Sequence, residues 1–95
     1  MTKIDVLSKR KDILSLARQH GAASIKIFGS VVRGEEQLNS DVDFLVRMEK
    51  GRSLLDMGGL LMDLQDLLGC KVDVISENGL RSRIKEHVLQ EAMPI

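Results

Sequence analysis

The order of apolar patterns along the chain limits its possible folds more than any other feature. Long stretches with apolar residues at helical spacing alternate with short runs rich in β-branched residues, which are typical of strands. The predicted helices cover residues 4–19, 31–33, 54–68 and 79–91, and the predicted strands cover residues 24–28, 41–47 and 71–75. This alternation predicts an α/β (α+β) domain in which helices cover a small three-stranded mixed sheet.

Glycines punctuate these segments. Gly21 and Gly69 stand where two of the helices are predicted to end. The helix over residues 54–68 contains Gly58 and Gly59 near its centre, where each costs about 1 kcal/mol relative to alanine. Close packing on a neighbouring element is the only reason that the sequence offers for this pair.

Length and composition limit what such a domain can do. The 95 residues are predicted to form a single domain spanning residues 1–95. Lys plus Arg and Asp plus Glu both number 14, which excludes a strongly basic protein that binds nucleic acid by bulk counterion release. Phe28 and Phe44 are the only aromatic residues, so no platform for base stacking is expected.

The sequence also indicates a cellular compartment. Cys70 is the only cysteine, so no internal disulfide is possible and a reducing environment is favoured. No apolar run is long enough to span a bilayer, and the first residues lack the apolar core of a signal peptide. We therefore expect a cytoplasmic protein without a membrane segment.

Three aspartates in two predicted strands indicate a metal site. Side chains alternate along a strand, so Asp41 and Asp43 share a face, with Cβ atoms roughly 6–7 Å apart. Asp73 interrupts the apolar strand over residues 71–75, and it can join the other two if the second and third strands are neighbours. Such carboxylates can converge on one divalent cation or a pair. Oxygen ligands without cysteine or histidine favour Mg²⁺ (or Mn²⁺) over Zn²⁺.

Gly29 and Ser30 precede these aspartates and have the features of a phosphate-binding turn. Glycine lets the backbone approach a ligand closely, and Ser30 begins a short predicted helix whose free N–H groups favour anions. Arg33, one turn into that helix, can pair with phosphate or with Glu35 or Glu36. Phosphates held at this turn and metal ions held by the aspartates would together form a nucleoside triphosphate site.

Each of these features alone has an ordinary structural explanation. A Gly-Ser pair usually forms a simple turn. An Asp-x-Asp at the start of a strand, or a single aspartate within one, usually faces solvent. Only their combination, in the order strand, turn, helix and strand, indicates nucleotide chemistry.

The spacing of these residues resembles that of a known family. Gly29-Ser30, ten intervening residues and Asp41-Val42-Asp43 match the Gly-Ser-x10-Asp-x-Asp signature of the DNA polymerase beta-like nucleotidyltransferase superfamily. The strings over residues 28–34 and 40–46 are similar to its minimal nucleotidyltransferases, the MntA-type antitoxins paired with HEPN-domain toxins. The order of helices and strands agrees over nearly the whole chain. One departure is Val32, where members often carry a smaller residue.

The resemblance implies a role for each motif residue. Asp41 and Asp43 would bind two Mg²⁺ ions that hold the phosphates of ATP. Asp73 would coordinate the catalytic metal and help to deprotonate the attacking hydroxyl, and Gly29 and Ser30 would hold the triphosphate. In this family the acceptor is a tyrosine of the HEPN toxin, itself an RNase, and pyrophosphate is the leaving group.

The resemblance therefore implies a Mg²⁺-dependent protein adenylyltransferase, an antitoxin that silences its HEPN toxin within a hetero-oligomer. A domain of 95 residues has room for the catalytic core alone, so a protein acceptor would bring its own surface. One alternative is a non-catalytic antitoxin that masks its toxin by stoichiometric binding. Another is a nucleotidyltransferase that acts on a small molecule or on tRNA ends, which the neutral charge and the lack of an acceptor domain disfavour.

Overall fold

The computed structural model describes residues 2–29, 32, 42–80 and 82–95. The elements in chain order are α1 (Lys3–Ser8), α2 (Arg10–Gln19), β1 (Ala22–Phe28), β2 (Val42–Met48), α4 (Leu54–Leu68), β3 (Val72–Ser76), the 3₁₀ turn η1 (Glu77–Gly79), α5 (Ser82–Glu91) and β4 (Met93–Pro94). The predicted α+β class is confirmed. The predicted short helix at 31–33 and the loop after it fall largely outside the described residues.

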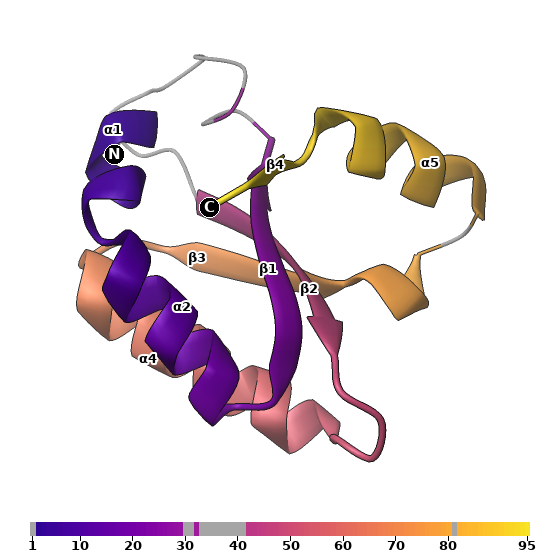
Figure 1. Cartoon of the computed structure of the whole chain (residues 1–95), viewed down its shortest axis with the longest axis horizontal. Helices are drawn as coiled ribbons and strands as arrows, with labels where there is room; N and C mark the ends of the chain where they lie inside the picture. The colour runs from indigo at the N-terminus through magenta and orange to yellow at the C-terminus, as the bar shows by residue number, and fades with distance from the viewer. Residues whose placement is uncertain (1, 30–31, 33–41, 81) are drawn as a thin grey trace.

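The sheet is mixed, with the strand order β3-β2-β1-β4 (Figure 1). β1 pairs antiparallel with both β2 and β4, whereas β2 and β3 are parallel. The prediction of three strands was therefore wrong by one. β4 is only two residues long and contains Pro94, which lacks a backbone N–H and is tolerated on an edge strand. No periodicity can be read from so short a segment.

The predicted helix over residues 4–19 is interrupted at Lys9, which separates α1 from α2. The Lys9 N–H donates to the Val6 carbonyl at 3.1 Å, with the spacing of a 3₁₀ turn. The Lys9 ammonium donates to the Leu67 carbonyl, in the last turn of α4, at 3.0 Å. This bond satisfies a carbonyl that has no partner within its own helix, and helical periodicity in the sequence cannot reveal it.

The last two helices differ in how well they were predicted. α4 has the expected bounds: Ser53 begins it with a capping box that includes Asp56, and Gly69 caps its end. The predicted helix over residues 79–91 instead begins at residue 82, after η1. Within the described ranges, no helix is long and apolar enough to cross a membrane.

The hydrophobic core lies between one face of the sheet and the helices α2 and α4, which Figure 1 shows together on the same side. α5 lies apart from them, beyond β1 and β2 (Figure 1). The buried members of the core come from alternate residues of β1 and β2, from Val72 of β3, and from α1, α2 and α4. They are Val6, Ile13, Ala17, Ile25, Ile27, Val42, Phe44, Val46, Leu60, Leu64, Leu68 and Val72.

Candidate active site

The register of β2 on β3 brings two of the predicted site residues together. The parallel pairing sets Asp43 directly beside Asp73, with Val42 beside Val72 before them. Neighbouring strands lie about 4.8 Å apart, and paired residues of adjacent strands point to the same face. Val42 and Val72 are buried in the core, so the two aspartates project from the opposite face, Asp43 half-buried and Asp73 exposed.

Gly29 brings the backbone against this pair. It follows Phe28, which is paired with Asp43 across β1 and β2. Its φ of +81° is in the left-handed region, and a Cβ atom at this position would collide with Oδ2 of Asp43. The Gly29 carbonyl accepts a hydrogen bond from the Val32 N–H at 3.1 Å, which closes a turn. A residue other than glycine would therefore strain the backbone and displace the carboxylate.

Three other predicted site residues, Ser30, Arg33 and Asp41, lie outside the described residues. Their parts in the site remain predictions. Val32, the one departure from the family pattern, is half-buried and packs against the hydrophobic core. The site that the structure describes is thus the junction of Gly29 with the Asp43–Asp73 pair.

The donor atoms at this junction fit a hard divalent cation. Asp43 and Asp73 offer carboxylate oxygens from adjacent strands on one face, and such oxygens are the ligands that Mg²⁺ prefers. Within the described ranges, no group of three or more histidine, cysteine, aspartate or glutamate residues is placed to hold a metal ion. The predicted third carboxylate, Asp41, lies outside those ranges, so the structure describes two of the three carboxylates that the sequence predicts for Mg²⁺.

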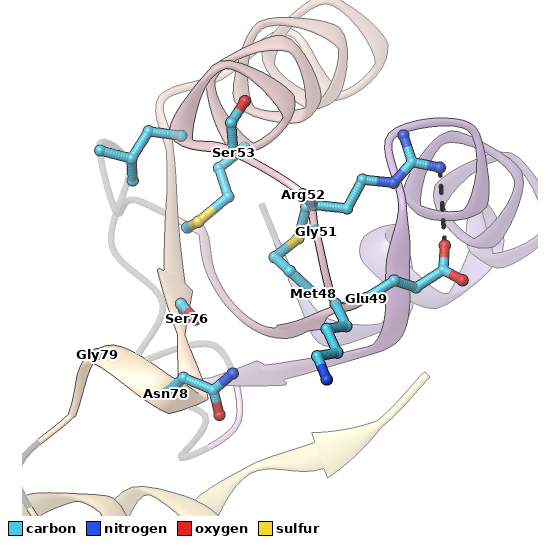
Figure 2. Close-up of a pocket in the computed structure, with 11 residues that line it drawn as sticks. Met48, Glu49, Gly51, Arg52, Ser53, Ser76, Asn78 and Gly79 are labelled. Carbon is cyan, nitrogen blue, oxygen red and sulfur yellow. Dashed lines mark ion pairs between the residues drawn. The ribbon is translucent and has the colours of Figure 1, made fainter.

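A separate pocket of about 460 Å³ lies at the other end of the same strands (Figure 2). Met48, at the end of β2, and Ser76, at the end of β3, line it together with residues 49–54, Met57 and residues 78–79 of η1. Met48 is five residues beyond Asp43, or roughly 17 Å along an extended strand. Arg52, which also lines the pocket, pairs with Glu49 at 3.8 Å. Among the residues that the structure describes, none of the site residues predicted from the sequence, Asp43 and Asp73 included, lines this pocket.

The model of the nucleotidyltransferase domain family matches residues 8–94, which is nearly the whole chain of 95 residues. The chain belongs to the nucleotidyltransferase domain family. This nucleotidyltransferase is 42% identical over 78 residues to the protein adenylyltransferase MntA of Thermococcus cleftensis, across 82% of this chain and 79% of the relative. The resemblance to minimal nucleotidyltransferases is thereby confirmed.

Solved structures share the fold of this nucleotidyltransferase. One named as a minimal nucleotidyltransferase has a TM-score of 0.91 and 46% identity, covering 100% of this chain and 97% of its own. A toxin–antitoxin complex with AMP-PNP has a TM-score of 0.77 and 22% identity, over 90% of this chain and 70% of that one. A structure of a Shewanella oneidensis MNT antitoxin in complex with a tri-AMPylated HEPN toxin has a TM-score of 0.69 and 18% identity. The match covers 99% of this chain and 71% of that chain.

Proposed function

We propose that this nucleotidyltransferase is a Mg²⁺-dependent protein adenylyltransferase. It would transfer AMP from ATP to a tyrosine of a HEPN RNase toxin in the cytoplasm and so neutralise the toxin. The observation that carries the proposal is the register of Asp43 beside Asp73, on one face of the sheet and against the backbone of Gly29. The name of the relative from Thermococcus cleftensis supports the type of reaction.

Different residues of the site would bind the triphosphate and the metal ions. Gly29 and Ser30, with Arg33 beside them, would hold the triphosphate through backbone N–H groups and a positive charge. Asp41, Asp43 and Asp73 would hold two Mg²⁺ ions, which supply charge stabilisation for the α-phosphate and the leaving pyrophosphate. Asp43 comes from β2 and Asp73 from the adjacent β3, so the sheet fixes the spacing of these two carboxylates before the nucleotide binds.

The proposed chemistry is a single in-line displacement. The phenolic oxygen of the acceptor tyrosine bonds to the α-phosphorus while the bond from that phosphorus to the α–β bridging oxygen breaks. AMP remains on the tyrosine, pyrophosphate leaves, and the phenolic proton passes to the carboxylate of Asp73, which is exposed and so accessible to an acceptor. No covalent intermediate with this chain is required.

The proposed partner is the folded toxin itself, within a hetero-oligomer. The single domain over residues 1–95 would supply the catalytic core, and the toxin would supply the surface that positions its tyrosine. Two structural relatives are toxin–antitoxin complexes, one with AMP-PNP and the other with an AMPylated HEPN toxin. These complexes support ATP as the nucleotide and a HEPN protein as the partner.

Intact-mass spectrometry tests the proposal. The purified protein is incubated with a cognate HEPN protein, ATP and Mg²⁺, and we expect the HEPN protein to gain one or more AMP-sized increments. Asp43→Asn should slow this gain at least about a hundredfold, because it removes a metal ligand. The same change at Asp66, an exposed aspartate on α4, is the matched control and should leave the rate within about twofold.

An unmodified HEPN protein after incubation with the wild-type protein would contradict the enzymatic proposal. The RNase activity of the toxin separates this proposal from stoichiometric masking. If Asp43→Asn neutralises the RNase as well as the wild type does at equal concentration, then binding, and not AMP transfer, silences the toxin.

A further inference from the structure

One charged residue on the face of the aspartate pair has no role in the proposed reaction. Ile25 and Ile27 of β1 are buried in the core, and because side chains alternate along a strand, Lys26 projects from the opposite face. That face carries Asp43 and Asp73. Lys26 is thus a cation on the same surface as the two carboxylates.

The strand register sets how close Lys26 comes to the site. Lys26 is paired with Leu45, and Phe28 is paired with Asp43. Lys26 and Asp43 are therefore diagonal neighbours across an antiparallel pair, about 7–8 Å apart at their Cα atoms, which long side chains can span. Asp73 lies one strand further on. A ligand held by Asp43 falls within reach of the Lys26 ammonium.

The surroundings of Lys26 are apolar within its own row of the sheet. It lies between Leu45, which is 1% exposed, and Pro94 of β4. Lys26 itself is half-buried, so its methylene groups cover apolar surface while the ammonium extends beyond it. With the residues that the structure describes, this ammonium forms no ion pair or hydrogen bond. The charge is therefore available to a ligand.

The charges at the site indicate which group of a ligand Lys26 would bind. The carboxylates and the phosphates of a nucleoside triphosphate are all anionic, and bound divalent cations offset only part of that charge. Arg33, the other cation proposed for this site, follows the Gly29 turn. Lys26 precedes that turn, one row of the sheet away from the aspartates. We infer that Lys26 binds a phosphate group of the nucleotide and positions it beside Asp43; this inference rests on the proposed function.

The affinity for the nucleotide tests this inference without requiring turnover. The probe is the α,β-methylene analogue of ATP, whose reactive bond is blocked, titrated in Mg²⁺ and followed by calorimetry. Lys26→Ala should raise Kd about tenfold, because a charged hydrogen bond to phosphate is lost. Lys26→Arg should stay within about threefold of the wild type, because it keeps the charge.

Arg47 provides the matched control. It lies on the same face of β2 and is exposed, but it is four residues beyond Asp43, or roughly 13 Å along the strand. Arg47→Ala should change Kd less than about twofold. Inorganic tripolyphosphate with Mg²⁺ is the second probe: its binding should weaken by the same factor in Lys26→Ala if the lysine contacts phosphate. If Lys26→Ala weakens the binding of the nucleotide but not that of tripolyphosphate, Lys26 does not contact a phosphate group and the inference is wrong.

Asp43→Asn separates the two proposals. One outcome is that the wild type and Lys26→Ala bind the nucleotide equally well and Asp43→Asn does not bind it. In that case the inference about Lys26 fails while the proposed function stands. If Asp43→Asn binds as well as the wild type, the proposed site itself is wrong. The melting temperature without ligand checks folding, and Lys26→Gln, which keeps most of the side chain, replaces the alanine variant if that variant unfolds.

Discussion

The two faces of the sheet are made by the same strands but differ in chemistry. On β2, Val42, Phe44 and Val46 point to one face and are fully buried under α2 and α4. Asp43, Leu45 and Arg47 alternate with them and point to the other face, where Leu45 is buried and the two charged residues are not. The burial of the first set holds the strand in place, and the second set is then presented at fixed spacing.

This division keeps charge out of the core. Among the residues that the structure describes, no polar or charged side chain is buried, so no carboxylate bears the full cost of desolvation. Asp43 and Asp73 can lie side by side because Asp73 is exposed and Asp43 is only half-buried, so neither carboxylate is cut off from solvent. Stability and the proposed chemistry can therefore be separated by substitutions only one residue apart on β2.

The largest effect is expected on the core face. Phe44→Ala should lower the free energy of unfolding by about 3–5 kcal/mol, because Phe44 is fully buried and its removal leaves a cavity. Chemical denaturation followed by circular dichroism measures the change. Asp43→Asn, one residue away on the other face, should change the unfolding free energy by about 1 kcal/mol or less. Similar losses in the two variants would contradict the division between the faces.

Gly29 is where the two faces are most closely linked, since it directly follows a core strand and a Cβ atom on it would collide with the carboxylate of Asp43. Gly29→Ala should lower the unfolding free energy by about 2–3 kcal/mol through backbone strain and the clash with Asp43. Thermal denaturation with and without ATP and Mg²⁺ should also show a smaller rise in melting temperature on ligand binding than in the wild type.

Gly51→Ala is the control for the backbone cost. Gly51 has a φ of +89°, and a Cβ atom there would meet nothing within 4 Å. This change should cost about 1–2 kcal/mol and leave the rise in melting temperature with ATP and Mg²⁺ intact. An equal loss of that rise in both variants would show that the contact between Gly29 and Asp43 has no special part in the site.

The sequence predicted most of the helices and strands because their signals are local, and a local motif also supplied the candidate site residues, whose roles stay predictions. Helical spacing gave the bounds of α4, and the Gly29–Asp43 spacing gave the family. The pairing of Asp43 with Asp73 was only a conditional prediction, since strand order depends on contacts between distant segments. The break at Lys9 was missed for the same reason: its hydrogen bond to Leu67 joins two helices far apart in the chain.

Gly58 and Gly59 show most directly that the local sequence pattern does not reveal tertiary contacts. They are adjacent in one helix, yet their surroundings differ. A Cβ atom on Gly59 would lie 2.8 Å from Cε1 and 2.9 Å from Nδ1 of His20. His20 Nε2 is 2.6 Å from Oδ2 of Asp63, which limits how far the ring can move. Nothing lies within 4 Å of a Cβ atom on Gly58, and the structure gives no reason for that glycine.

The smallest predicted effects follow from this difference, and they have opposite signs. Gly58→Ala should raise the free energy of unfolding by about 0.5–1 kcal/mol through helix propensity alone. Gly59→Ala gains the same propensity but overpacks His20, so it should lower that free energy by about 1 kcal/mol. Urea denaturation of both variants measures the two changes. Stabilisation of equal size in both would mean that the α2–α4 contact yields to an extra methyl group.

A double-mutant cycle locates the cause of the loss. In a His20→Ala background the ring is absent, so Gly59→Ala should become stabilising, by about as much as Gly58→Ala in the wild type. The change in sign would show that the cost of a Cβ atom at position 59 comes from the His20 contact and not from the helix itself. Gly59 would then be a packing residue of the core face, which no property of its own helix could have indicated.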